Sequence, residues 1–265
     1  MKEDKTSLIK DLLPLAREAG AAILKVYSLG EVKTTYKEGG SPLTVADSAA
    51  HDIIAAGLAR LTPGVPVLSE ESRAEPYEVR RRWKSFWLVD PLDGTKEFIN
   101  RNGEFTVNIA LIEDGAPVLG LVYAPVLDVA YYGIKGVGAF KAASGGAPEP
   151  IKTAGYTGGA VRVVASRSHR GEALEAFLER IKEAECLSMG SSLKLCLVAE
   201  GRAHLYPRFG PTMEWDTAAA HSVVEAAGGS VTDFEGRPLE YNKEDLANPY
   251  FMVTGSPPFP WKRFL

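Results

Sequence analysis

The chain has 265 residues, with 30 basic and 34 acidic side chains and a formal net charge of -4. This near balance gives no electrostatic case for a nucleic-acid groove or an anionic membrane surface, so we expect a small-molecule partner. The length fits one large domain or two modest ones, and we expect two. The two cysteines, Cys186 and Cys196, provide no disulfide framework, which suits a reducing compartment.

The N-terminal region begins with ten residues of alternating charge, without the uninterrupted apolar segment of a signal peptide or membrane span. We therefore expect a cytoplasmic protein with no integral membrane segment, and peripheral attachment to the inner face of the cell membrane stays open. Apolar residues then recur at helical spacing from Leu8 to Val26, and Pro14 is a point where this helix kinks or restarts. A second helix is expected from about Thr44 to Leu61.

Acidic residues stand at the ends of the next two elements. Asp47 lies in the first turn of the second expected helix, where the helix macrodipole favours an acid. A short apolar strand is then expected at residues 65–68, and the sequence Ser-Glu-Glu-Ser follows it at residues 69–72. Because side chains alternate along a strand, we expect one of Glu70 and Glu71 to point inward, and we choose Glu70. The alternative is a solvated acidic loop.

The stretch from Trp87 to Phe98 changes abruptly from an apolar strand to an acidic turn. Pro91 has no backbone N–H to donate to a neighbouring strand, so it is expected to interrupt the strand. Gly94 allows the backbone to turn tightly before a helix begins at Thr95. Asp90 and Asp93 therefore lie at the carboxyl end of a strand, where a shared cation would relieve their repulsion. Mg²⁺ is the natural candidate, and the N–H groups at the helix start offer a phosphate site. The alternative is a solvated turn in which Asp93 caps the helix.

The remaining elements divide into two groups. Apolar runs at 106–112, 117–124 and 128–132 predict an antiparallel meander, which completes an α+β domain of residues 1–140. Residues 141–265 alternate between strands and helices and predict an α/β domain. Its strands are expected at 161–166, 203–206, 230–233 and 251–254, and its helices at 172–182, 192–200 and 216–227. Asp216 opens the last helix, where an ordinary N-cap role is the alternative to metal binding.

Three motifs in this order resemble the inositol monophosphatase superfamily of Mg²⁺-dependent, lithium-sensitive phosphatases: S-E-E-S, W-L-V-D-P-L-D-G-T-K-E-F and W-D-T-A-A-A-H. Within it, N-G-E-F-T-V-N-I-A-L and L-Y-P-R-F-G-P-T-M-E-W-D look like the 3′(2′),5′-bisphosphate nucleotidase branch, the bacterial CysQ type. The resemblance covers nearly the whole chain. It implies the sugar-phosphatase fold, an α/β/α/β/α sandwich, with the active site between the two domains.

The resemblance also implies roles for individual residues. Thr95, paired with Asp47, would orient and deprotonate the attacking water, with Glu70 close to it. The backbone at Gly94 and Thr95 would hold the phosphate. The Mg²⁺ ligands would be Glu70, Asp90, Asp93, Asp216 and the main-chain carbonyl of Leu92, and all of these except Asp90 would also contact the substrate. The nucleotide contacts would be Ser166, His169, Ser191 and Lys194, with Arg208 on the second phosphate. For Lys194 the alternative is a solvated helix lysine, and for Arg208 it is an ion pair with Glu214.

The implied reaction is direct in-line hydrolysis of the 3′-phosphate of adenosine 3′,5′-bisphosphate (PAP) to AMP and phosphate, without a covalent enzyme intermediate. The related sulfonucleotide PAPS is a further expected substrate, giving APS. Two alternatives stay open. One is an inositol or sugar-phosphate phosphatase with the same metal site, and the other is a catalytically inactive module that binds a metal or a nucleotide. Either a monomer or a homodimer is expected.

Overall fold

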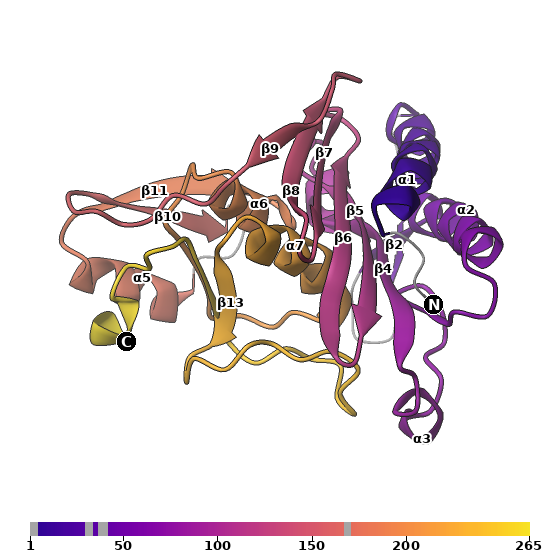
Figure 1. Cartoon of the computed structure of the whole chain (residues 1–265). Coiled ribbons are helices and arrows are strands. Elements are labelled where there is room, and N and C mark those ends of the chain that lie inside the picture. Colours follow the sequence, from indigo (N-terminus) through magenta and orange to yellow (C-terminus); the bar gives the residue numbers. More distant parts are fainter. Residues whose placement is uncertain (1–4, 30–33, 37–41, 167–170) are drawn as a thin grey trace.

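The computed structural model describes residues 5–29, 34–36, 42–166 and 171–265. Two β-sheets enclose one layer of helices and carry further helices on their outer faces, which gives five layers in the order α/β/α/β/α (Figure 1). The expected fold class is therefore confirmed. Within the described ranges, no helix combines the length and the apolar character needed to cross a membrane.

The first outer layer consists of α1 (Lys5–Tyr27) and α2 (Val45–Leu61), which pack against each other and against the larger sheet. Apolar side chains at helical spacing form the buried face of α1. The helix does not restart at Pro14, which lies inside it. A short antiparallel ladder of β1 (Thr34–Tyr36) and β2 (Pro42–Thr44) precedes α2.

The larger sheet has seven strands in the order β3-β4-β5-β6-β7-β8-β9. The pair β3 and β4 is parallel, and the other neighbouring strands are antiparallel, as the expected meander requires. Short helices α3 (Tyr77–Arg80) and α4 (Thr95–Ile99) flank β4 in the chain. The strands are β3 (Val67–Ser69), β4 (Ser85–Asp93), β5 (Thr106–Glu113), β6 (Ala116–Ala124), β7 (Val129–Ile134), β8 (Gly138–Ala143) and β9 (Glu149–Ile151).

Strand β4 differs from the expectation that Pro91 ends it. The strand continues to Asp93, and its register against β5 shifts between Asp90 and Asp93. This irregularity absorbs the proline, which has no N–H to give to the ladder. The sheet also runs on through β8 and β9, so the expected boundary at residue 140 falls inside β8. The division into two domains stays a prediction.

The central layer contains α7 (Glu214–Ala226) and α6 (Leu193–Ala199). Helix α7 packs directly on β5, β6 and β7 of the larger sheet and also contacts β13 of the smaller one (Figure 1). Its approach to the larger sheet requires glycine: a Cβ at Gly133 would lie 2.5 Å from the Ser222 carbonyl oxygen and 2.6 Å from the Val223 Cα. This packing fixes the helix that carries Asp216.

The smaller sheet has five strands in the order β11-β10-β12-β14-β13. Helix α5 (Glu172–Arg180) and the 3₁₀ turn η1 (Trp261–Phe264) cover its outer face through Phe177 and Trp261. The edge strand β11 was not expected from the sequence. The strands are β10 (Val161–Ser166), β11 (Ala184–Met189), β12 (Leu205–Arg208), β13 (Ser230–Asp233) and β14 (Phe251–Thr254).

Candidate metal centre

Two of the expected acidic residues are brought together by the parallel pair β3 and β4. Ser69 lies opposite Val89 in the register, and the Glu70 N–H donates to the Val89 carbonyl oxygen at 3.1 Å. Both strands run toward the same edge of the sheet, so Glu70, which follows the end of β3, lies beside Asp90, which is three residues before the end of β4. The Leu92 N–H donates to Asp90 Oδ1 at 3.0 Å, which fixes the turn beyond Asp90.

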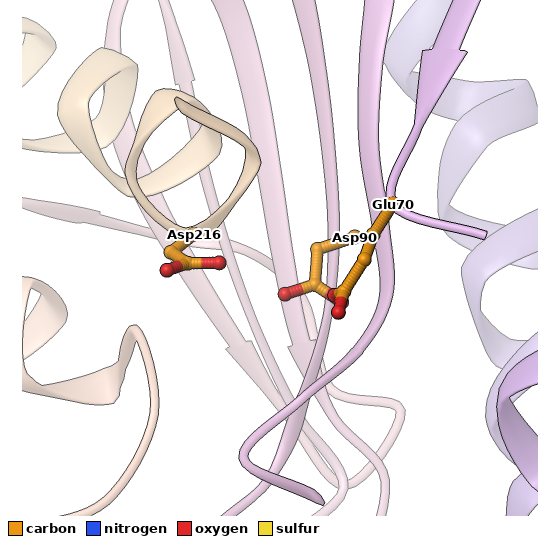
Figure 2. A group of neighbouring side chains, drawn as sticks. All are labelled: Glu70, Asp90 and Asp216. Atoms are coloured by element: carbon orange, nitrogen blue, oxygen red, sulfur yellow. The ribbon is translucent and has the colours of Figure 1, made fainter. Parts of the chain in front are cut away.

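Asp216 approaches the same pair from the other half of the chain. One carboxylate oxygen each from Glu70, Asp90 and Asp216 lie within 4.8 Å of one another (Figure 2). Helix α7 begins at Glu214, with Met213 as its N-cap, so Asp216 is not the N-cap residue that the sequence allowed. It stands three positions after the N-cap and accepts the Met213 N–H through Oδ2 at 2.9 Å. This bond leaves the other carboxylate oxygen for a ligand.

Burial among other acids gives these carboxylates unusual electrostatics. Burial is the largest cause of the raised pKa of Asp90, and the charges of Glu70, Asp93 and Asp216 raise it further. Burial, followed by the charge of Asp93, raises the pKa of Asp216 to about 8. A cation would supply the missing countercharge, and carboxylate oxygens are the ligands that hard divalent ions prefer. The donor set therefore fits a Mg²⁺-type ion.

Asp93 lies apart from this three-carboxylate group and has donors of its own. Its Oδ2 accepts the Ser192 N–H at 2.6 Å and faces the Asn108 side-chain amide at 3.5 Å. Asp93 and Asp216 line a cavity of 80 Å³ together with Lys194 and Arg208. The expected fourth carboxylate is therefore at the site, and its charge acts on both Asp90 and Asp216.

The turn after Asp93 has the backbone that the sequence predicts. Gly94 has φ 91° at the N-cap of α4, in the left-handed region that favours glycine. The Thr95 hydroxyl lies 3.5 Å from the Leu92 carbonyl oxygen, the atom expected to bind the metal. Asp47 is buried in the first turn of α2, which packs on β4.

The expected nucleotide contacts differ in how the structure places them. Lys194 is 8% exposed, and its ammonium donates to the Ser191 carbonyl oxygen at 2.5 Å, so the solvated-lysine alternative is wrong. Burial lowers the pKa of Lys194. Arg208 donates to the Pro211 carbonyl oxygen at 2.9 Å and borders a neighbouring cavity of 560 Å³.

Two further predictions for these residues have different outcomes. The suggested ion pair of Arg208 with Glu214 is wrong, because Glu214 pairs with Lys243 at 2.6 Å. Ser166 ends β10, but its side chain and His169 lie outside the described residues.

A buried cluster of small polar groups supports Asp93 and was not foreseen. The Ser192 hydroxyl donates to Asn108 Oδ1 at 2.8 Å, and the Thr106 hydroxyl lies 3.1 Å from the same oxygen. The Ser191 hydroxyl contacts that of Thr106 at 2.5 Å. Thr106 and Asn108 share one face of an otherwise apolar strand, and this pair of polar residues two positions apart was a usable signal.

The fold and the three-carboxylate group together define an α/β protein with a candidate metal site between the larger sheet and the central helix α7. The profile of the inositol monophosphatase family matches residues 4–254. The chain belongs to this family, whose members are generally metal-dependent.

Close relatives and a solved structure agree with this assignment. The chain is 52% identical to the 3′(2′),5′-bisphosphate nucleotidase CysQ of Salmonella typhimurium, over 93% of this chain and 99% of that protein. It is 51% identical to the nucleotidase of the same name from Escherichia coli, with the same coverage. The crystal structure of CysQ from Bacteroides thetaiotaomicron, at 43% identity, superposes with a TM-score of 0.82 over 94% of this chain and 97% of that chain.

Proposed function

We propose that the protein is a Mg²⁺-dependent phosphomonoesterase that hydrolyses the 3′-phosphate of adenosine 3′,5′-bisphosphate to AMP and phosphate, and that PAPS is a further substrate. The observation that carries the proposal is the meeting of Glu70, Asp90 and Asp216 beside a cavity that Lys194 and Arg208 also line. Carboxylates for a metal and cations for a second anionic group thus occupy one site. The nucleotidases at 52% and 51% identity support this choice of substrate.

The metal would be held by Glu70, Asp90, Asp93, Asp216 and the Leu92 carbonyl oxygen. When bound, a divalent ion neutralises phosphate oxygens and lowers the pKa of a coordinated water. The larger sheet and the central helix α7 position the side-chain oxygens of this set. The parallel pair β3 and β4 places Glu70 next to Asp90, and the first turn of α7 presents Asp216 from the opposite side.

The attacking water would be oriented by the Thr95 hydroxyl, which lies at the start of α4, with Asp47 accepting the proton. Water then attacks phosphorus in line with the leaving group: an O–P bond to water forms while the bond from phosphorus to the 3′-oxygen breaks. The 3′-oxygen takes a proton from a solvent water to become the hydroxyl of AMP, and Asp47 returns the proton it accepted to solvent. The N–H groups at Gly94 and Thr95, at a helix start, would hold the phosphate oxygens.

Recognition of the nucleotide would depend on Lys194 and Arg208, the two cations that line the 80 Å³ cavity at the carboxylates. Lys194 is held by Ser191 and is already desolvated, so an anion that pairs with it meets a preorganised ammonium group. Arg208 separates the 80 Å³ cavity at the carboxylates from the 560 Å³ cavity next to α5 and therefore lies within reach of both. A substrate with two phosphates suits a site in which proposed metal ligands and two cations line one cavity.

The first test measures phosphate release from adenosine 3′,5′-bisphosphate and from inositol 1-phosphate with Mg²⁺, with EDTA, and with Mg²⁺ plus lithium. We expect a strong preference for the nucleotide, no release with EDTA, and inhibition by lithium. A preference for inositol 1-phosphate would retain the metal site and reject the nucleotide contacts. Binding of the nucleotide without Mg²⁺-dependent release would instead support an inactive binding module.

A substitution at Asp93 tests the metal site directly. Asp93→Asn keeps the size of the side chain and removes the charge, so we expect phosphate release at saturating Mg²⁺ to fall at least about 100-fold. Asp114→Asn is the matched control, because Asp114 lies in an exposed turn between β5 and β6. Circular dichroism should show both variants folded. Activity of Asp93→Asn within twofold of the unsubstituted protein would contradict its role as a ligand.

A further inference from the structure

A buried Arg and a buried Glu outside the active site join the two halves of the carboxylate group. We propose that Arg80 and Glu214 are positioning residues, which act through residues 242–244 to hold Asp216 opposite Glu70 and Asp90. We call Arg80, Glu214 and residues 242–244 the clasp. The inference rests on the metal site proposed above and assigns residues that set its geometry without touching the ion.

Glu214 forms the α7 end of the clasp. It is the first residue of α7, two positions before Asp216, and its side chain is fully buried. Its carboxylate accepts the Asn242 N–H at 2.6 Å, the Lys243 N–H at 3.0 Å and the Lys243 ammonium at 2.6 Å. These three donors, which come from two consecutive residues, fix the orientation of the Glu214 carboxylate. They also connect the first turn of α7 to residues 242–243.

Arg80 forms the other end of the clasp. It is 3% exposed, and its guanidinium donates to Asn242 Oδ1 at 3.0 Å, to the Glu244 carbonyl oxygen at 2.7 Å and to the Lys243 carbonyl oxygen. The Asn242 side-chain amide returns a bond to the Arg80 carbonyl oxygen at 2.6 Å. The planar fork of an arginine suits three acceptors in fixed places, and a lysine could not reproduce it.

The places of these residues in the chain connect the clasp to the metal site. Arg80 ends α3, which lies in the connection between β3 and β4, and Glu70 and Asp90 stand at the carboxyl ends of those two strands. Glu214 lies in the same helical turn as Asp216. In Figure 1 the segment after β13 runs beneath the larger sheet toward the side where α3 lies. The clasp thus joins the β3–β4 connection to the start of α7.

Stability alone is a weak reason to bury these charges. Desolvation of a buried ion pair often offsets its attraction, and well-packed apolar side chains of similar volume can be equally stable. The clasp also fixes the position of the start of α7 relative to the connection between β3 and β4. Metal coordination needs this fixed position, because a ligand displaced by a fraction of an ångström loses affinity and supporting partners commonly contribute about 10–100-fold to metal binding.

The test measures Mg²⁺ affinity by isothermal titration calorimetry, with protein that circular dichroism shows to be folded. Arg80→Met keeps an unbranched stem and removes every donor, so we expect the Kd for Mg²⁺ to rise about tenfold. The Mg²⁺ concentration that gives half-maximal phosphate release should rise in parallel, with the KM for the nucleotide at saturating Mg²⁺ unchanged. A lowered Tm with an unchanged Kd would show a merely structural role and overturn the proposal.

A second variant tests the clasp if Arg80→Met does not fold. Asn242 has φ 73°, so Asn242→Gly relieves backbone strain, keeps the N–H that Glu214 accepts and removes only the two side-chain bonds to Arg80. Its Kd for Mg²⁺ should also rise. Ser144→Gly, at φ 48° in an exposed turn, is the matched control and should leave the Kd unchanged.

The outcomes separate the clasp from the proposed function. An unsubstituted protein that binds no Mg²⁺ would overturn the metal site and the clasp together. An unsubstituted protein that binds Mg²⁺, with Asn242→Gly binding it equally well, would overturn the clasp alone.

Discussion

Asp93 differs from Asp90 and Asp216 in where its hydrogen-bond donors come from: Asp90 and Asp216 accept N–H groups two and three residues away, whereas the donors that face Asp93 lie on other elements. Its Oδ2 accepts the Ser192 N–H at 2.6 Å, and the Asn108 amide faces the same oxygen. The Asn108 amide is itself oriented, because hydroxyl groups of Ser192 and Thr106 face its oxygen and leave its NH₂ group toward Asp93. A flipped amide would place an oxygen against the carboxylate, which the charge of Asp93 disfavours.

Asn108→Ala tests this cluster. Asn108 is fully buried, and its removal leaves two hydroxyl groups without their acceptor, so we expect the free energy of unfolding to fall by about 1–3 kcal/mol. Urea unfolding measures the change. Asn102→Ala is the control, because the exposed Asn102 side chain accepts the Glu104 N–H at the surface, and we expect its loss to cost well under about 1 kcal/mol. Equal effects of the two substitutions would contradict a role for the buried cluster.

The acids of the site could be predicted from the sequence, but their supporting residues could not. Glu70, Asp90 and Asp216 each stand at the end of a recognisable strand or helix, so local pattern is enough to single them out. The partner of Asn108, by contrast, is Ser192, 84 residues further along the chain. The same holds for Arg80 and Asn242, separated by 162 residues. Such contacts follow only from the packed fold.

Among the elements, α7 has the greatest influence on the site because it carries Asp216 and lies directly on the larger sheet. Glycines in β6 and β7 make this approach possible, and an added Cβ at Gly133 would meet helix backbone that cannot move aside like a side chain. We therefore expect Gly133→Ala to lower the free energy of unfolding by about 1–3 kcal/mol or more. Displacement of α7 should also weaken Mg²⁺ binding.

Urea unfolding and Mg²⁺ titration check the substitution at Gly133. The control is Gly171→Ala, because an added Cβ there has open space within 4 Å and the residue lies outside the α7 contact. We expect its effect on stability to stay below about 1 kcal/mol. A Gly133→Ala protein as stable as the control would mean that the helix can move away from the sheet without loss.

The spacing of apolar residues in the sequence predicts most of the helices and strands, and it fails where that spacing is weak. The long helices and the meander have strong periodicity, and the structure contains them close to the expected bounds. Strand β11 lies at an edge and is only partly buried, so it has little apolar signal, and β9 has only three residues. Pro91 misled the expectation for β4, because a shift in register lets the strand pass the proline.

At the scale of the whole molecule, the site depends on both halves of the chain. Glu70 and Asp90 belong to the larger sheet, whereas Asp216 and the donor to Asp93, Ser192, come from the second half. A metal ion that binds Glu70, Asp90 and Asp216 together binds only the folded protein, in which these carboxylates meet. By mass action it therefore stabilises the whole fold. Two of the proposed ligands, Asp90 and Asp216, are carboxylates whose ionised form burial and neighbouring acidic charges disfavour in the metal-free protein.

This linkage predicts how pH changes stability. Without metal, the pKa of Asp216 is raised from 3.8 to about 8 in the folded protein, and that of Asp90 is also raised. As pH rises from about 4 to about 8, the unfolded chain releases these protons while the folded protein retains them, so these groups make the folded state progressively less stable. Bound Mg²⁺ requires the ionised carboxylates, so its stabilising effect grows over the same range.

Thermal unfolding at pH 5.5 and pH 8, with and without excess Mg²⁺, measures this effect as the difference in Tm between the two conditions. Other titrating groups shift the Tm with and without metal alike, so the difference isolates the groups that bind the ion. We expect a larger Mg²⁺-dependent rise in Tm at pH 8, and we expect Asp90→Asn to abolish it, because the amide cannot supply the charge. A rise of equal size at both pH values would contradict the shared burial of these carboxylates as the basis of metal binding.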